Sequence, residues 1–172
     1  SALFARERVT LQQRLADLVT DIQHVGSTAV PDLLAKPILD IAMAIPALDL
    51  IPDIAEKLTE ICYIYQGDTG EDGGHLFVKD SEPDTCTVHL HVVEISDRQW
   101  ANYLAFRQAL REDETLRNRY AEIKLDLARR YANDRESYTS AKDEFIRGVL
   151  DQIVNGQPPF SNPPAGHPSA RR

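Results

Sequence analysis

The sequence predicts an α+β fold, in which a small mixed β-sheet is followed by a helical C-terminal half. Three observations lead to this prediction. Apolar and polar residues alternate along residues 38–45 and 85–94, as they do in strands with one buried face. From Asp97 onward the apolar residues recur at helical spacing. A chain of 172 residues also suits a single hydrophobic core.

Two elements are expected before the first clear strand. Residues 3–19 predict a helix, because their leucines recur near one stripe and charged residues lie elsewhere. Residues 22–25 predict a short strand, which the Gly26-Ser27-Thr28 step interrupts. Residues 30–36 then predict a loop or a short helical turn.

The clearest strand covers residues 38–45. Its odd positions, from Leu39 to Ile45, are apolar and form one face, because side chains alternate across a strand. Asp40 points to the opposite face. Pro46 ends the strand, and residues 48–60 predict an amphipathic helix, since a proline is tolerated in a first turn.

Three more strands and three helices complete the predicted fold. Strands at residues 61–66 and 75–80 flank an acidic, glycine-rich loop, and a longer strand follows at 85–94. In that last strand Cys86, Val88, Leu90 and Val92 share the core face, whereas Thr87, His89 and His91 share the other. Helices are expected at residues 97–111, 113–131 and 138–155, with Ser96 as the N-cap of the first and Gly156 ending the last.

The end of the chain predicts a tail rather than part of the domain. Residues 157–172 contain five prolines, one phenylalanine and no valine, isoleucine or leucine. Such a segment has little apolar surface to offset the entropy lost on ordering. We therefore expect one domain at residues 1–156 and a proline-rich tail at residues 157–172.

Charge and cysteine content narrow the function classes. The net charge is -8, with 19 basic and 27 acidic side chains, so a protein that coats duplex nucleic acid is not expected. The two cysteines form no CxxC motif and no Cys/His cluster, which argues against a structural zinc site or a disulfide framework and fits a reducing cytoplasm. No apolar run approaches the roughly 20 residues that cross a bilayer, so no membrane association is expected.

Asp40 is the strongest candidate site residue. A carboxylate in the middle of an apolar strand must be solvated, paired or bound to a cation, because burying it unpaired is costly. His89 and His91 stand two residues apart on the off-core face of their own strand, where both imidazoles could reach one metal ion or phosphate. An incidental acid and two exposed histidines on solvated strands are the alternatives.

Weaker candidates lie in loops and on a later helix. The glycine of Gly26-Ser27-Thr28 would let a ligand approach the backbone and its hydroxyls could bind phosphate, although a helix cap is the simpler interpretation. Lys36 could reach a phosphate as a point charge, or be a solvated loop lysine. Tyr138 and Lys142 are four residues apart and share a helix face, although an ordinary surface pair is the simpler interpretation.

Taken together, these motifs resemble the GrpB family. The first motif runs from His24 to Pro31 and continues through Ala35-Lys-Pro-Ile-Leu-Asp-Ile41, and the second is Val88-His-Leu-His-Val-Val-Glu94. Leu104-Ala-Phe-Arg107 and residues 134–145 resemble the helical C-terminal half of that family. The resemblance covers about residues 4–150.

The resemblance implies a nucleotidyltransferase-like fold, with a small mixed sheet and helices packed on one face. In that superfamily a Gly-Ser step holds nucleotide phosphates, and a pair of strand carboxylates binds Mg²⁺. Gly26 and Ser27 match the step and Asp40 matches the first carboxylate, but the second carboxylate is replaced by Ala42. His89 or His91, with Glu94, is then expected to complete the site.

Two functions remain open at this stage. The first is a nucleotidyltransferase-like enzyme that binds a nucleotide with Mg²⁺ and transfers a nucleotidyl group to an unknown acceptor. The second is a non-catalytic binding or helper domain in coenzyme A metabolism, because similar domains occur fused to dephospho-CoA kinase. The expected catalytic residues are Asp40, His89 and His91, with Asp40 also binding the metal, and the expected substrate-binding residues are His24, Gly26, Ser27, Thr28, Lys36, Tyr138 and Lys142.

Overall fold

The computed structural model describes residues 1–70, 73–82 and 85–156, and gives the backbone alone for residues 81, 82 and 85–87. The chain divides into two compact units, one ending at Ala121 and one beginning at Glu122. The tail expected at residues 157–172 lies outside the described residues, so the division predicted there stays a prediction.

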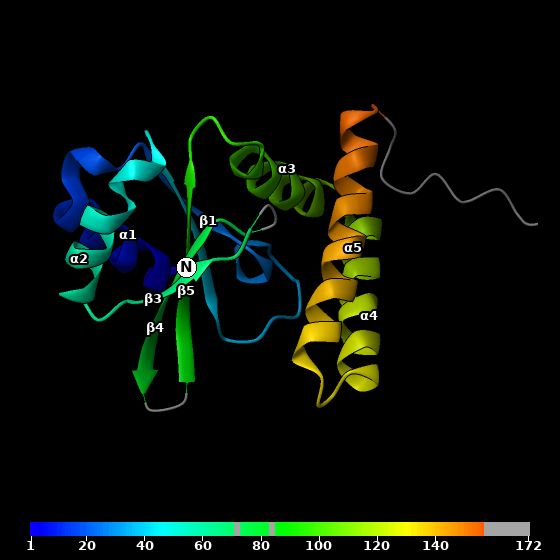
Figure 1. Cartoon of the computed structure of the whole chain (residues 1–172). Helices are drawn as coiled ribbons and strands as arrows, with labels where there is room; N and C mark the ends of the chain where they lie inside the picture. The colour runs from blue at the N-terminus through cyan, green and yellow to red at the C-terminus, as the bar shows by residue number, and fades with distance from the viewer. Residues whose placement is uncertain (71–72, 83–84, 157–172) are drawn as a thin grey trace, which may run out of the picture. The chain divides into compact units, whose positions relative to one another are not determined.

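The first unit contains five strands and, up to Glu112, three α-helices with short 3-10 turns between them (Figure 1). In chain order these elements are α1 (Ala2–Leu15), η1 (Ala16–Leu18), β1 (Asp21–Val25), η2 (Ser27–Ala29), β2 (Leu39–Ile45), η3 (Leu48–Leu50), α2 (Ile51–Thr59), β3 (Ile64–Asp68), β4 (His75–Glu82), β5 (Thr85–Glu94) and α3 (Arg98–Glu112).

The five strands form one mixed sheet in the order β1-β2-β5-β4-β3. The central pair, β2 and β5, is parallel, and the other pairs are antiparallel. The parallel register places Asp40 opposite His89 and Ala42 opposite His91. The strands β2 and β5 are far apart in the sequence, and their pairing brings Asp40, His89 and His91 together near the centre of the sheet.

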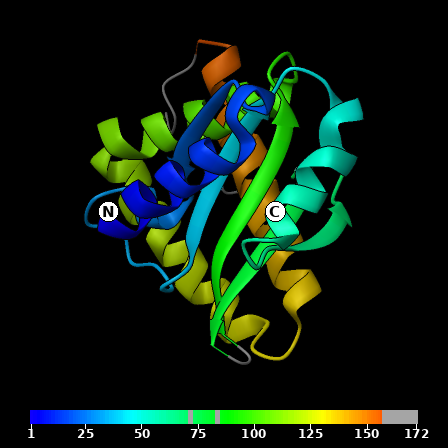
Figure 2. The ribbon, with the colours of Figure 1, turned by 90° about the vertical axis from the view of Figure 1, so that its left-hand side faces the viewer.

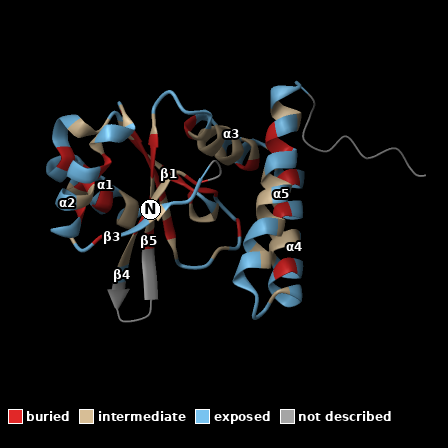
Figure 3. Cartoon of the chain, in the orientation of Figure 1, coloured by how far each residue is buried: buried red, intermediate tan, exposed pale blue. Residues whose placement is uncertain are grey.

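One face of the sheet carries the main core. Leu39, Ile41 and Met43 of β2 and Val88, Leu90 and Val92 of β5 are buried there, which confirms the predicted alternation for the side chains described. Leu11 and Leu15 of α1 and Ile54 and Leu58 of α2 cover them. Figure 2 shows both helices in front of the same face, and Figure 3 shows buried residues along the inner strands of the sheet.

The opposite face is partly covered by α3. Ala42, Ala44 and Val93 are buried in a second cluster with Trp100, and Tyr103 and Leu104 pack against it. The predicted α+β fold class, a small mixed sheet followed by a helical C-terminal half, is confirmed, but helices pack on both faces of the sheet instead of the one face expected, because α3 covers part of the second face. The helix α3 therefore covers part of the sheet face on which Asp40, His89 and His91 were expected to be exposed to solvent.

The second unit contains the end of α4 (Glu114–Arg130) and all of α5 (Arg135–Val154). The helix α5 begins three residues before the predicted start, because the Asp134 carboxylate accepts hydrogen bonds from the Ser137 amide and hydroxyl. The prediction that Gly156 ends this helix is confirmed: its φ is 66°, and its N–H donates to the Ile153 carbonyl.

Two local predictions were wrong. The strand expected at residues 61–66 begins at Ile64, since Ile61 and Tyr63 donate to the Leu58 carbonyl and close the end of α2 first. Ser96 does not cap α3; its hydroxyl donates to the Glu94 carboxylate, while Asp97 caps the helix by accepting from the Gln99 amide.

A buried polar group joins α1 to the sheet. The Glu7 carboxylate of α1 accepts a 3.0 Å hydrogen bond from the Tyr63 hydroxyl and forms a 3.0 Å ion pair with Lys79 of β4. The Lys79 ammonium also lies 5.3 Å from the centre of the Tyr63 ring. Burial, followed by the negative charge of Glu7, raises the pKa of Tyr63, so this hydroxyl stays protonated and acts as a donor.

Candidate functional site

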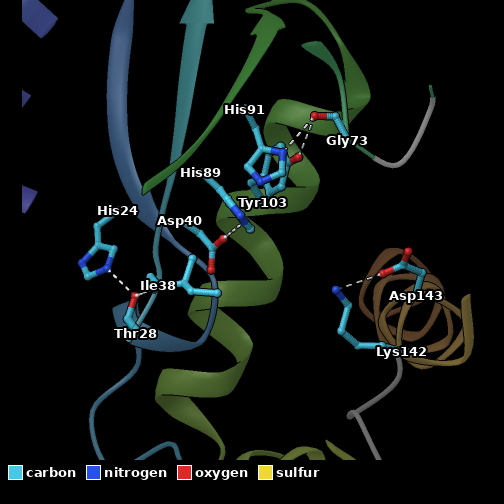
Figure 4. A network of polar contacts seen from close by, with 10 residues as sticks. All are labelled: His24, Thr28, Ile38, Asp40, Gly73, His89, His91, Tyr103, Lys142 and Asp143. Atoms are coloured by element: carbon cyan, nitrogen blue, oxygen red, sulfur yellow. Dashed lines mark hydrogen bonds and ion pairs between the residues drawn. The ribbon is translucent and has the colours of Figure 1, made fainter. Parts of the chain in front are cut away.

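Asp40, His89 and His91 form one cluster on the sheet face that lies opposite the main core (Figure 4). One donor atom from each lies within 4.8 Å of the other two. Asp40 Oδ1 and His89 Nδ1 are 3.4 Å apart across the parallel strands. Their side chains are 28% and 18% exposed, so the cluster is shielded but open to a small ligand.

His91 is oriented by the loop between β3 and β4. Its Nδ1 lies 3.2 Å from the Gly73 carbonyl oxygen, to which the Tyr103 hydroxyl of α3 also donates. A carbonyl oxygen only accepts, so Nδ1 carries the proton, and the lone pair of the neutral ring is on Nε2. The Tyr103 ring, 5.5 Å away, packs against the imidazole and restricts its orientation.

Gly26 holds a special position beside the cluster. Its φ is 69°, and a Cβ atom placed on it would lie 2.3 Å from Asp40 Oδ2. The group that approaches this glycine is therefore the Asp40 carboxylate itself. The glycine makes room for the candidate acid, and the approach of a ligand to its backbone stays a prediction.

His24 and Thr28 connect the Gly-Ser turn to the start of β2. The Thr28 hydroxyl donates to the Ile38 carbonyl at 3.2 Å, so it accepts from His24 Nε2 at 3.0 Å. His24 also stacks on Phe4. Burial, followed by nearby positive charges that include Arg111, lowers the pKa of His24 to about 4, and the ring is neutral near pH 7.

Two arginines of α3 hold the backbone on each side of this turn. Arg107 donates to the His24 carbonyl at 2.7 Å, and Arg111 donates twice to the Ala29 carbonyl, at 3.0 and 2.6 Å. Arg111, Tyr103 and Gly73 were not predicted from the sequence as parts of the site. Tyr103, Arg107 and Arg111 are spaced by four residues, so they share one face of the helix. This spacing is a signal in the sequence that could have indicated Tyr103 and Arg111.

The other predicted residues lie in the loop before β2, at the end of β5 and on α5. Lys36 is exposed in the loop before β2, and its carbonyl accepts from the Ile38 amide. Glu94 accepts from Ser96 instead of joining the cluster. Tyr138 and Lys142 lie on α5 in the second unit, where Lys142 pairs with Asp143 at 3.5 Å, and their part in a site stays a prediction.

The donor atoms fit Mg²⁺ poorly. Mg²⁺ favours oxygen ligands in octahedral geometry, whereas the cluster offers one carboxylate and two imidazoles. The second strand carboxylate that the resemblance implies is absent. Ala42 stands in its place and is fully buried in a cluster with Val93 and Trp100. Binding of Mg²⁺ at this cluster stays a prediction.

Comparison with known proteins identifies similar chains. A family model described as "GrpB protein" matches residues 1–152. The glutamate-rich protein GrpB of Alkalihalophilus pseudofirmus is 35% identical, with 88% of each chain covered. The crystal structure of conserved protein GrpB from Enterococcus faecalis superposes with a TM-score of 0.79 at 29% identity, covering 90% of this chain and 92% of that chain.

A weaker similarity extends to a named enzyme. The dephospho-CoA kinase of Mycobacterium bovis is 28% identical to this chain, and the match covers 73% of this chain but 36% of that protein. The region that resembles this chain is therefore only one part of that longer kinase. Among the residues that the structure describes, no helix combines the length and the apolar content needed to span a bilayer.

Proposed function

The chain belongs to the GrpB family, and from this premise we propose that its first unit binds the phosphates of a nucleotide beside Asp40, as a nucleotidyltransferase-like protein. One observation carries the proposal. The Gly26-Ser27 turn lies directly against the carboxylate of Asp40, so that the two elements that a nucleotidyltransferase-like site combines are adjacent.

The surroundings of the turn support this function. Arg107 and Arg111 fix the backbone at His24 and Ala29, on either side of the turn. The hydrogen bond between His24 and Thr28 fixes it from within. A phosphate-binding backbone works best when it is held in place before the ligand arrives, because less entropy is then lost on binding.

A second candidate function is a non-catalytic binding domain for a coenzyme A precursor. The observation that favours it is the burial of Ala42, together with Val93 and Trp100, at the position where a second catalytic carboxylate is expected. The similarity to a dephospho-CoA kinase supplies the ligand class. Both candidates bind a phosphorylated small molecule, and they differ in whether a bond is made and broken.

Calorimetric titration of the four nucleoside triphosphates and of dephospho-CoA tests binding. We expect one of these ligands to bind with 1:1 stoichiometry. Ser27→Ala should weaken it about fivefold, which corresponds to roughly 1 kcal/mol for one hydrogen bond. Ser140→Ala, an exposed serine on α5, is the matched control and should leave the affinity unchanged. If none of the five ligands binds with Mg²⁺, Mn²⁺ or Zn²⁺ present, the proposal is wrong.

A pyrophosphate-release assay separates the two candidates. In nucleotidyl transfer an acceptor oxygen bonds to the α-phosphorus, and the bond from that phosphorus to pyrophosphate breaks. The bound nucleotide is incubated with a filtered small-molecule extract that supplies acceptors. Release that depends on Asp40 favours the transferase, and tight binding without release favours the binding domain.

A further inference from the structure

We propose that Asp40, His89 and His91 form a binding site for a divalent transition-metal ion of the Zn²⁺ class, in place of the Mg²⁺ that the fold implies. Two imidazoles and one carboxylate are the donors that such ions prefer, whereas Mg²⁺ takes oxygen ligands. The proposal concerns the metal alone and does not rest on nucleotide binding.

The distances in the cluster suit one ion. Metal–ligand bonds of about 2.0–2.2 Å place two ligand atoms of a tetrahedral site about 3.3 Å apart. Asp40 Oδ1 and His89 Nδ1 are already 3.4 Å apart. The separations between the donor atoms of the cluster do not exceed 4.8 Å, so side-chain rotations that move these atoms by about 1.5 Å or less close them to this spacing.

Hydrogen bonds around the cluster prepare the ligands. A histidine that binds a metal usually donates its other ring N–H to a carbonyl or carboxylate, which fixes its tautomer. His91 makes such a bond from Nδ1 to the Gly73 carbonyl, so its lone pair is on Nε2. On the other side of the cluster, Gly26 lies against Oδ2 of Asp40 and restricts the carboxylate.

The charge of the site indicates what else would bind there. One carboxylate and two neutral imidazoles leave a divalent ion with a net charge of about +1, and three protein ligands leave a coordination position open. An anionic oxygen, such as that of a phosphate, suits this position. The metal would then supply the positive charge that Mg²⁺, held by two strand carboxylates, supplies in the resemblance.

Titration of the chelator-treated full chain with ZnCl₂, and separately with MgCl₂, tests the proposal. We expect one Zn²⁺ per chain, bound about 100-fold more tightly than Mg²⁺. Asp40→Asn, His89→Gln and His91→Gln should each weaken Zn²⁺ about tenfold or more. His75→Gln is the matched control, because His75 lies on the same sheet but pairs with Tyr65 outside the cluster. Cys62→Ser removes an exposed thiol that could bind Zn²⁺ elsewhere.

Co²⁺ provides a readout that does not depend on stability. Bound through the two imidazoles, it should give visible d–d absorption that decreases in both histidine variants and persists in His75→Gln, with circular dichroism establishing that each variant is folded. Three results would overturn the proposal: Zn²⁺ binding no tighter than Mg²⁺, unchanged binding in His89→Gln and His91→Gln, or loss of binding in His75→Gln or Cys62→Ser.

Discussion

Gly26, at the end of β1, and Asp40, in β2, lie so close that a Cβ atom on Gly26 would be 2.3 Å from the Asp40 carboxylate oxygen Oδ2. The backbone of Gly26 also has a φ of 69°, which residues with a side chain rarely adopt. A substitution there must therefore strain the turn and displace the carboxylate together. This makes Gly26 a sensitive test of how the site is held.

We expect Gly26→Ala to lower the free energy of unfolding by about 1–3 kcal/mol, through strain and the displacement of Asp40. The control is Gly148→Ala in α5, where no atom lies within 4 Å of the added Cβ and φ is not positive. That change should stabilise the helix by up to about 1 kcal/mol, because alanine is the better helix former. Urea unfolding measures both, and equal effects of the two substitutions would contradict this prediction.

The positions of Asp40, His89 and His91 show what a sequence can and cannot predict. Alternation along each strand correctly placed all three away from the main core, because the side-chain period of a strand is fixed. It could not reveal that β2 and β5 pair in parallel with Asp40 opposite His89, since pairing between distant strands depends on the whole sheet. The role of Gly73 was also out of reach, because its backbone carbonyl, not a side chain, orients His91.

Removing one member of the group formed by Glu7, Tyr63 and Lys79 should destabilise the fold more than removing all of its polar atoms. Glu7→Ala leaves the buried Tyr63 hydroxyl and the partly buried Lys79 ammonium without their partner, so we expect the free energy of unfolding to fall by about 3 kcal/mol. The triple variant Glu7→Leu, Tyr63→Phe and Lys79→Met removes every polar member, and should lose less than Glu7→Ala.

The control for this group is the exposed pair of Asp126 and Arg130 on α4. Asp126→Ala should cost less than about 0.5 kcal/mol, because exposed ion pairs contribute little. Chemical unfolding of the four proteins measures the differences. A triple variant less stable than Glu7→Ala would mean that the polar group itself stabilises the fold.

Buried His24 should make stability depend on pH between about 4 and 6.5. Its folded pKa is about 4, against 6.5 in the unfolded chain, so in this window the unfolded chain binds more protons. Stability therefore decreases as the pH falls from 6.5 towards 4, by up to about 3 kcal/mol from this residue. His24→Gln should remove that part of the dependence. Thermal unfolding across the window measures it, and identical pH profiles would contradict the assignment.

The last prediction joins the metal proposal to the proposed function. If the ion held by Asp40, His89 and His91 has an open position, a nucleotide phosphate can occupy it, and Zn²⁺ and the nucleotide should stabilise the protein together by more than the sum of their separate effects. At a ligand concentration about 100-fold above its Kd, linkage gives about 2.7 kcal/mol, which raises Tm by roughly 5–10 °C. Asp40→Asn should remove the excess, because the amide keeps the shape of the side chain but loses its charge, and Ser140→Ala should retain it. Additive shifts in the wild-type chain would mean that metal and nucleotide bind independently, and the phosphate would then have to be bound by the Gly26-Ser27 turn without the ion.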